Sequence, residues 1–181
     1  MYCGTNKTAL QSQKLIADAM MRLIQEKPYQ QITISELCKA AGISRQTFYS
    51  LFTSRENVVV FTLQARYCDA PEPPRLKTDR EVCGLRQLCR GYSEYILRNQ
   101  GLLRLLVENH IDYLLYDSLY EALDECGCFL HAVDPCTRRY AASFYAGGVA
   151  CVARRFAEEG CRTSAGQLEE LLMTLFTGSL F

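Results

Sequence analysis

The 181-residue sequence lacks several features that mark other classes of protein. It has no tryptophan and two histidines, His110 and His131, and it shows no Ser-His-Asp set, no phosphate-binding glycine loop and no triad of metal ligands. No apolar run approaches the ~20 residues of a membrane-spanning helix, and the polar N-terminus is unlike a secretory signal. We therefore expect a cytoplasmic protein, not an enzyme, without a metal or a cofactor. A histidine acid–base site is the unsupported alternative.

Ten cysteines are present, but none belongs to a C-x-x-C pair. The C-x-C pair at positions 126 and 128 has no second pair and no histidine cluster that would complete a zinc site. Cys38, Cys89 and Cys151 fall on apolar faces of expected helices, where a thiol packs as a small hydrophobic group. These patterns favour reduced thiols in the cytosol. The alternative is a redox sensor that uses Cys126, Cys128 or Cys136.

The formal net charge is zero, but the charges are unevenly distributed. Residues 1–66 hold eight Lys/Arg and four Asp/Glu, a net charge of +4, and the remainder carries −4. A neutral chain is not a general binder of polyanions. A basic N-terminal part next to an acidic body instead suits local contact with nucleic acid through the N-terminal part alone.

The stretch from Thr33 to Glu56, TISELCKAAGISRQTFYSLFTSRE, has the signals of two helices joined by a tight turn. Thr33 and Glu36 form a capping-box pattern at the start of the first helix. Gly42 supplies the left-handed residue that a short turn needs, and Ser44 suits the N-cap of the second helix. We therefore predict a helix-turn-helix motif.

The second helix of this motif, from Arg45 to Phe52, has two faces. At about 100° per residue, Phe48, Leu51 and Phe52 share one arc, which predicts a buried side. The other arc carries polar side chains suited to phosphates and base edges, so we expect it to enter the major groove of DNA. These outward residues are Arg45, Gln46, Tyr49 and Ser50.

The whole chain is expected to be all-α, with about nine helices in two parts. Residues 1–54 form the predicted DNA-binding head, and 55–67 a connecting helix opened by Ser54 as cap. The segment 68–78 contains three prolines and predicts a joint. Residues 79–181 predict a helical body that closes with helices from Pro135 to about Glu159 and from Ser164 to about Gly178.

The region from Leu10 to Leu63 resembles the head of the TetR family of bacterial transcriptional regulators. The resemblance is carried by Ala41-Gly42-Ile43-Ser44, Phe48-Tyr49, Phe52 and Ser54-Arg55-Glu56. Two positions depart from the family pattern: Arg55 replaces the usual lysine, and Leu51 stands where many members have a polar residue. The C-terminal FYAGGVACVARRFAEEG segment is similar to that of one subgroup.

The resemblance implies a homodimer whose heads bind a palindromic operator, a body that binds a small-molecule effector, and a four-helix dimer interface made by the last two helices. A ligand-responsive repressor is the function expected. The candidate DNA-binding residues are Thr33, Ser35, Ser44, Arg45, Gln46, Thr47, Tyr49 and Arg55. Simple alternatives exist for several: Thr47 would support the turn, and Arg55 would pair with a nearby acid.

In the body, aromatic side chains are the candidates for an effector site, with a tyrosine-rich core as the alternative. The candidate ligand-binding residues are Tyr92, Tyr95, His110, Tyr113, Tyr116, Phe144 and Tyr145. A Gly-Gly pair inside a helix permits close approach of another helix and favours a dimer seam, with a kink as the alternative. The candidate dimer residues are Gly147, Gly148, Cys151, Leu168, Leu172, Leu175 and Phe176. Two other functions stay open: an activator that works through a protein partner, and a helical interaction module that does not bind DNA.

Overall fold

The structure is a computed structural model, which describes residues 5–68, 84–126, 129–130 and 132–178. Within these ranges the chain forms nine α-helices and one short 3-10 helix and no strand, as the all-α prediction requires. The elements are α1 (Lys7–Glu26), η1 (Tyr29–Gln31), α2 (Ile34–Ala41), α3 (Arg45–Leu51), α4 (Arg55–Cys68), α5 (Leu85–Arg98), α6 (Gln100–Glu108), α7 (Tyr113–Glu125), α8 (Pro135–Glu158) and α9 (Ala165–Thr177).

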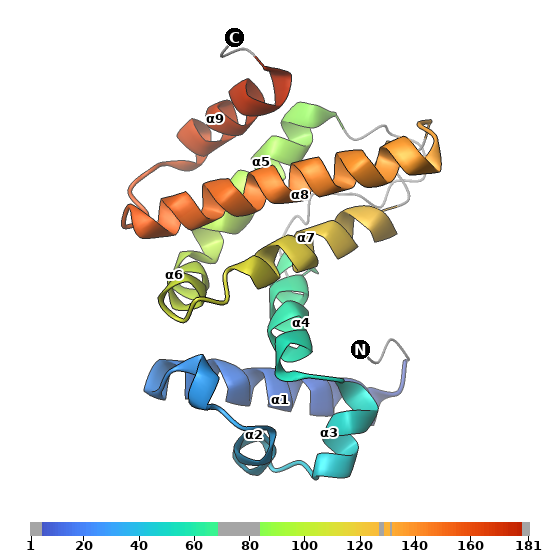
Figure 1. Cartoon of the computed structure of the whole chain (residues 1–181), viewed down its shortest axis with the longest axis vertical. Coiled ribbons are helices and arrows are strands. Elements are labelled where there is room, and N and C mark those ends of the chain that lie inside the picture. The colour runs from blue at the N-terminus through green and yellow to red at the C-terminus, as the bar shows by residue number, and fades with distance from the viewer. Residues whose placement is uncertain (1–4, 69–83, 127–128, 131, 179–181) are drawn as a thin grey trace. The chain divides into compact units, whose positions relative to one another are not determined.

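The chain divides into two compact units, which we call the first unit (Met1–Ala65) and the second unit (Arg66–Phe181). Helix α4 contributes residues to both (Figure 1). The predicted division instead ended the head at residue 54 and treated 55–67 as a separate connecting helix. Most of the predicted proline-rich joint, and the start of the helix expected from Asp79, lie outside the described residues.

The first unit is organised around apolar side chains from α1, η1, α2, α3 and α4. Ile16 and Met20 of α1 are fully buried, as are Ile32, Leu37 and Phe48. Within α1, apolar residues such as Ile16 and Met20 recur at three- and four-residue steps and so lie on one stripe. Helix α1 packs on α2 and α3. Removal of this apolar surface from water is the main term that holds these short helices together.

The caps of the motif form largely as the sequence predicts. The Thr33 hydroxyl accepts a hydrogen bond from the Glu36 backbone N–H at 3.2 Å. The reciprocal half of the predicted capping box is replaced, because the Glu36 carboxylate pairs with Lys27 at the end of α1. This ion pair lowers the pKa of Glu36. At the start of α4 the Ser54 hydroxyl accepts from the Asn57 N–H at 3.3 Å.

The second unit is built around α8, the longest helix. Helices α6 and α7 pack on α8, α9 packs on α5, and α8 and α9 also contact each other (Figure 1). The buried side of α8 consists mainly of small residues, Ala142, Ala146, Val149 and Ala153, which allow neighbouring helices to come close. Facing leucines of α6 and α7 fill the space, including Leu106, Leu114 and Leu123.

Both ends of α8 follow from local chemistry. Asp134 caps its start by accepting from the N–H groups of Cys136 and Thr137 at 3.0 and 3.1 Å, and Pro135 occupies the first turn. A hydrogen bond with the Thr137 side chain, followed by these backbone hydrogen bonds, lowers the pKa of Asp134. Gly160 follows the helix with a φ of +80°, a left-handed conformation that ends it.

Arg138 of α8 holds the end of α7 and the turn that follows. Its Nη2 donates to the carbonyl oxygens of Asp124 and Cys126 at 2.9 and 2.8 Å, and its Nε donates to that of Phe129 at 3.0 Å. These carbonyls lie past the last helical hydrogen bonds of α7, where a partner outside the helix is needed. One guanidinium therefore supplies a C-terminal cap from a neighbouring helix.

The two glycines of α8 have different surroundings. A Cβ added to Gly148 would lie 2.7 Å from Cε1 of the Phe176 ring on α9, whereas one added to Gly147 would meet nothing within 4 Å. Phe176 also contacts the ring of Tyr145, with centroids 4.8 Å apart. Gly148 thus permits the close approach of α8 and α9 within one chain. The Gly147-Gly148 pair was predicted to permit such an approach at a dimer seam, but at Gly148 the neighbouring helix belongs to the same chain.

Two further residues predicted for the dimer interface lie in a contact within one chain. Leu168 and Leu172 of α9 are buried inside the second unit, where α9 packs against α5. The side of α9 that carries Leu171 and Leu175 is exposed instead. Helix α9 therefore has two apolar sides. One packs against α5, and the other faces solvent in the single chain.

Candidate nucleic-acid interface

The turn between α2 and α3 has the geometry that the sequence predicts. Gly42 adopts φ +67° and ψ +29°, the left-handed conformation that a residue with a side chain rarely takes. The N–H groups of Gly42 and Ile43 bond back to the carbonyls of Lys39 and Cys38, at 3.2 and 2.9 Å. These hydrogen bonds satisfy the last carbonyls of α2 and direct the chain into α3.

Helix α3 is capped by its own first residues. The Ser44 hydroxyl accepts from the Thr47 N–H at 3.0 Å, and the two hydroxyls lie 2.8 Å apart. Both side chains are therefore engaged in holding the turn, the simpler of the two roles considered for Thr47. A phosphate contact by either hydroxyl stays a prediction.

The two faces of α3 are separated as the helical period predicts. Phe48 is completely buried, and Leu51 and Phe52 lie beside it in the core. Tyr49 is 51% exposed, and Arg45, Gln46 and Ser50 are exposed with it. The buried Leu51 explains the departure at that position, because its side chain belongs to the core and not to the surface.

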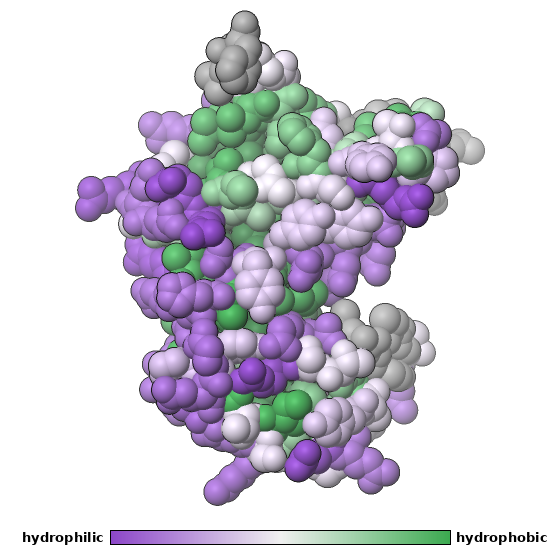
Figure 2. Space-filling model, in the orientation of Figure 1, coloured by the Kyte–Doolittle hydropathy of each residue, from purple (hydrophilic) through white to green (hydrophobic). Residues whose placement is uncertain are grey.

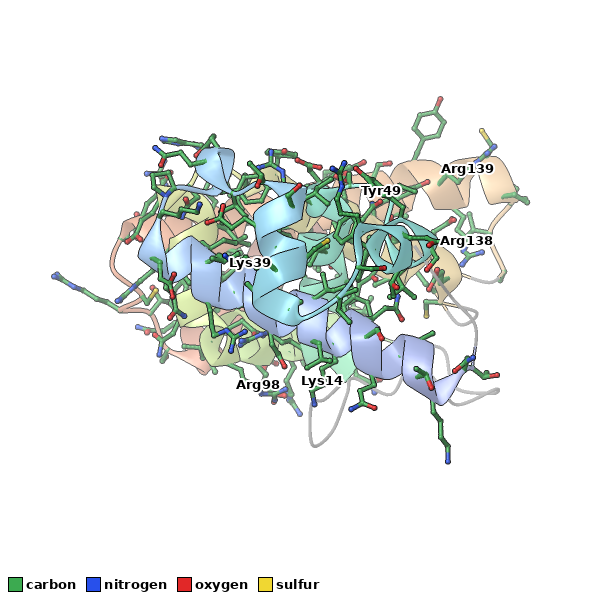
Figure 3. All side chains as sticks on the ribbon, turned by 90° about the horizontal axis from the view of Figure 1, so that it is seen from below. Lys14, Lys39, Tyr49, Arg98, Arg138 and Arg139 are labelled. Atoms are coloured by element: carbon green, nitrogen blue, oxygen red, sulfur yellow. The ribbon has the colours of Figure 1, made fainter. Side chains whose placement is uncertain are left out.

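The first unit also carries exposed basic and hydroxyl groups outside α3. Lys14 on α1 and Lys39 on α2 are exposed, and Figure 3 labels both together with Tyr49. Thr33 and Ser35 lie at the N-terminus of α2, where free N–H groups and the helix dipole favour an anion. Arg22 of α1 instead donates to the Ala40 carbonyl at 3.3 Å, which ties α1 to α2.

Arg55 is placed inside the first unit more than the sequence predicts. Its Nη1 donates to the carbonyl oxygens of Tyr29, at 3.1 Å, and of Ile32. The guanidinium carbon lies 4.8 Å from the centre of the Tyr29 ring, within the range of a cation–π contact. The partners are thus backbone carbonyls and a ring, not the acid of the alternative reading. The phosphate contact stays a prediction.

Glu56 completes this arrangement, which we call the Arg55 clamp (Tyr29, Ile32, Arg55 and Glu56). The Tyr29 hydroxyl donates to the Glu56 carboxylate at 2.8 Å. Partial burial raises the pKa of Glu56, but hydrogen bonds from its own N–H, from Ser54 and from Tyr29 outweigh burial and lower it overall. The first turn of α4 therefore holds the linker that leads into the Thr33 cap of α2. In the sequence, the sole signal of this arrangement was the arginine at position 55 in place of the usual lysine.

The residues predicted to bind an effector are not gathered in one place. Tyr92 and Tyr95 are buried in the core on α5, and burial raises the pKa of Tyr95. Tyr113 and Phe144 are 56% and 63% exposed, because the inward side of each helix is occupied by other residues. His110 is exposed and has a positive φ at a helix end. Phe144 and Tyr145 share one aromatic cluster, which also contains Phe129 and Phe176.

The described thiols are free, and their surroundings differ. Cys38 and Cys89 are buried as predicted, and burial, the largest cause, raises the pKa of Cys89 to about 11. Cys151 is exposed, which corrects its assignment to a packed apolar face. Of the three cysteines of the redox hypothesis, Cys126 is buried, Cys136 is exposed, and Cys128 lies outside the described residues.

Among the described residues, no three His, Cys, Asp or Glu side chains lie together as a metal site would require. Likewise, none of the helices in the described ranges is long and apolar enough to cross a membrane.

A glycine turn between two capped helices, with a polar outward face on the second, defines the helix-turn-helix class of DNA-binding proteins. Residues 16–60 match the family described as bacterial regulatory proteins, tetR family. Residues 16–60 therefore form a DNA-binding region of the type found in the TetR family of transcriptional regulators, whose members are DNA-binding regulators and not enzymes.

One curated relative is similar in sequence over a limited region. The HTH-type dhaKLM operon transcriptional activator DhaS of Lactococcus lactis subsp. lactis (strain IL1403) is 33% identical over 63 residues. The match covers 35% of this chain and 34% of DhaS, so it spans about a third of the relative's length.

Two solved structures share the fold along nearly the whole chain. Lin0861 from Listeria innocua superposes with a TM-score of 0.75 at 16% identity, covering 98% of this chain and 95% of that one. The dihydroxyacetone kinase operon activator DhaS gives a TM-score of 0.52 at 19% identity, covering 93% and 95%. At these identities the likeness concerns the fold alone.

Proposed function

We propose that the protein is a sequence-specific DNA-binding regulator that reads an operator with the exposed face of α3. The observation that carries the proposal is the separation of Phe48 and Tyr49: adjacent residues, one fully buried and one 51% exposed. It fixes which side of α3 is free for DNA. Arg45 and Gln46 on that side have the donors that pair with guanine and adenine edges in the major groove.

Phosphate contacts around α3 would set the orientation of the helix. Thr33 and Ser35 at the N-terminus of α2, Ser44 at that of α3 and the Tyr49 hydroxyl are placed in sequence around the turn. Contacts of this kind position a protein on the duplex without reading sequence. The +4 charge of residues 1–66 favours approach to the duplex.

The proposed active form is a homodimer whose interface is the exposed side of α8 and α9. Figure 2 shows a continuous hydrophobic area over α9 and the adjoining part of α8. Its exposed apolar side chains include Phe144, Leu171 and Leu175. Large exposed apolar patches mark interaction sites, and Gly147, with open space beside it, permits a second helix to approach. Leu168 and Leu172 are not part of this interface.

The first candidate for the direction of regulation is repression by occupancy, with a small-molecule effector bound in the second unit. Two heads of a dimer would fit successive major grooves, about 34–36 Å apart. An effector would release them by preferring a conformation with another spacing. Among the residues predicted to bind an effector, we favour the aromatic cluster around Tyr145, because its rings lie in contact with one another.

The second candidate is activation through a protein partner. It is favoured by the name of the similar protein DhaS, an operon activator. The sequence match to DhaS covers about a third of either chain, so it supports DNA binding more directly than it supports a direction of regulation.

The test of DNA reading uses Arg45→Ala, with Arg139→Ala as the matched control. Arg139 is likewise exposed, but it lies on α8 in the second unit. A binding sequence is first selected from a random duplex library with the wild-type protein. Arg45→Ala should weaken binding to it by about 1–3 kcal/mol and relax the preference at one base pair. Equal affinities for Arg45→Ala and Arg139→Ala would contradict the proposal.

The test of the dimer compares two leucines of one helix by light scattering. The wild-type mass should be near twice 20.6 kDa. Exposed Leu175→Ser should shift the equilibrium toward the monomer without lowering the melting temperature of the subunit. Buried Leu172→Ser should instead destabilise the subunit itself, because it places a hydroxyl in an apolar core. A wild-type monomer at micromolar concentration would contradict the dimer.

A further inference from the structure

The outward face of α7 carries a row of tyrosines that the proposed function does not use. Tyr113, Tyr116 and Tyr120 follow one another at three- and four-residue steps, and the first two are 56% and 36% exposed. The rings of Tyr116 and Tyr120 are stacked with centroids 6.0 Å apart. The opposite side of α7 fills the core with Leu114, Leu115, Ser118, Leu119 and Leu123. The tyrosines are therefore not needed to pack α7.

The same face is acidic. Asp117, Glu121 and Asp124 are exposed and lie on the arc of the tyrosines, and the helix sequence YLLYDSLYEALDE contains no Lys or Arg. Among the arginines of α8, Arg138 donates to backbone carbonyls and Arg154 pairs with Asp112, the N-cap residue of α7, at 3.4 Å, whereas Arg139 is exposed. The face thus presents aromatic rings and carboxylates together.

This combination selects among possible partners. Carboxylates repel the phosphates of nucleic acids and the anionic headgroups of a membrane surface. A single convex helix face does not enclose a small molecule, which binds in a concave site. A second copy of the chain is disfavoured as well, because a two-fold contact would bring identical acidic faces together. A protein with a basic surface fits both the shape and the charge.

We propose that the face formed by Tyr113, Tyr116, Asp117, Tyr120, Glu121 and Asp124 docks a second protein through an arginine-bearing surface. A planar guanidinium stacks on a tyrosine ring and pairs with a carboxylate at the same time, which a lysine ammonium does less well. Tyrosine is also among the residues that contribute most to protein interfaces. The inference goes beyond the proposed function and does not depend on DNA binding.

The test uses a synthetic probe in place of the partner. A fluorescent helical peptide with arginines at every fourth position is compared with its lysine and glutamine twins, by anisotropy on the full-length protein. The variant is Tyr113→Ala/Tyr116→Ala, and the control is Tyr140→Ala, an exposed tyrosine of α8. Since all three side chains are exposed, equal circular-dichroism melts are expected for the three proteins.

The wild type should bind the arginine peptide about fivefold more tightly than the lysine peptide, and the glutamine peptide should not bind. The α7 variant should lose this preference, and Tyr140→Ala should keep it. Equal binding of the arginine and lysine peptides, or no effect of the α7 variant, would overturn the proposal. So would a fall of the α7 variant to a monomer in light scattering, since the face would then be covered by a second copy.

Discussion

Each of the two units of this protein is stabilised internally by a different kind of interaction. In the first unit, α2 and α3 have eight and seven residues, fewer than the ~12–15 that an isolated helix needs in water. The caps at Thr33 and Ser44 and the Arg55 clamp add the stability that such short helices lack on their own. In the second unit, α8 alone has 24 residues, and its small buried residues fit against facing leucines.

Single substitutions are therefore expected to act differently in the two units. In the first unit polar side chains satisfy backbone groups, three residues away at the caps and 23–26 residues away in the Arg55 clamp, so a polar change there disturbs the helices of the motif directly. In the second unit the close packing contacts join distant parts of the chain, such as Gly148 with Phe176. Shape and volume therefore matter more there than local hydrogen bonding.

The largest expected effect separates structure from function on α3. Phe48→Ala should cost about 3–5 kcal/mol, because a fully buried ring is replaced by a cavity. Tyr49→Ala should change stability by less than about 0.5 kcal/mol and still weaken DNA binding. Thermal unfolding and binding to the selected duplex measure the two quantities. A stable Phe48→Ala protein would refute the assignment of the buried face.

The Arg55 clamp gives the next effect. Arg55→Lys keeps the charge but loses the geometry that reaches two carbonyls and a ring, so we expect a loss of about 1–2 kcal/mol and faster amide exchange around Ile32 and Thr33. Arg45→Lys on the exposed face is the control and should keep the stability. If Arg55 serves only a phosphate, Arg55→Lys should be as stable as the wild type and keep the salt dependence of duplex binding.

In the second unit, substitutions at the two adjacent glycines of α8 should change stability in opposite directions. Gly148→Ala should destabilise by about 1 kcal/mol, since the added methyl group displaces the Phe176 ring. Gly147→Ala should stabilise the subunit by about 0.5–1 kcal/mol, because alanine favours the helix and nothing obstructs it. Denaturant unfolding measures both. A gain at both positions would show that α8 and α9 do not approach closely at Gly148.

The smallest expected effect is the pH dependence of the first unit. The pKa of Glu56 is lowered in the folded state, so its contribution to stability is present above the unfolded value near 4.5 and is lost as pH falls through the folded value. The melting temperature of Glu56→Gln should therefore lie below that of the wild type at pH 6–7. The difference should shrink below pH 4.5. A constant difference across this range would exclude the carboxylate as its source.

The motif could be predicted in detail because its signals are local. Gly42, Ser44 and the alternation between Phe48 and Tyr49 act within a few residues of their partners, and each lies where the sequence predicts. The long helices were also predictable from their apolar period. The partner of each apolar stripe was not: Leu172 belongs to an intrachain contact, although its pattern suits a dimer seam equally well.

The positions of aromatic and charged side chains were the least predictable. A helical stripe that contains Tyr92 and one that contains Tyr113 look alike in sequence, yet one is in the core and the other faces solvent. Arg55 and Glu36 bind groups brought near only by the folded chain. Such roles depend on tertiary packing, which composition and period do not specify.

The guanidinium of Arg138 has a consequence for the order of folding. The carbonyls of Asp124 and Cys126 at the end of α7 accept hydrogen bonds from this guanidinium, which becomes available to them once α8 is in place. The last turn of α7 is thus stable only together with the first turns of α8. In hydrogen exchange the two helices should unfold and refold as one cooperative unit. The acidic tyrosine face of α7 should therefore be formed only while both helices are folded.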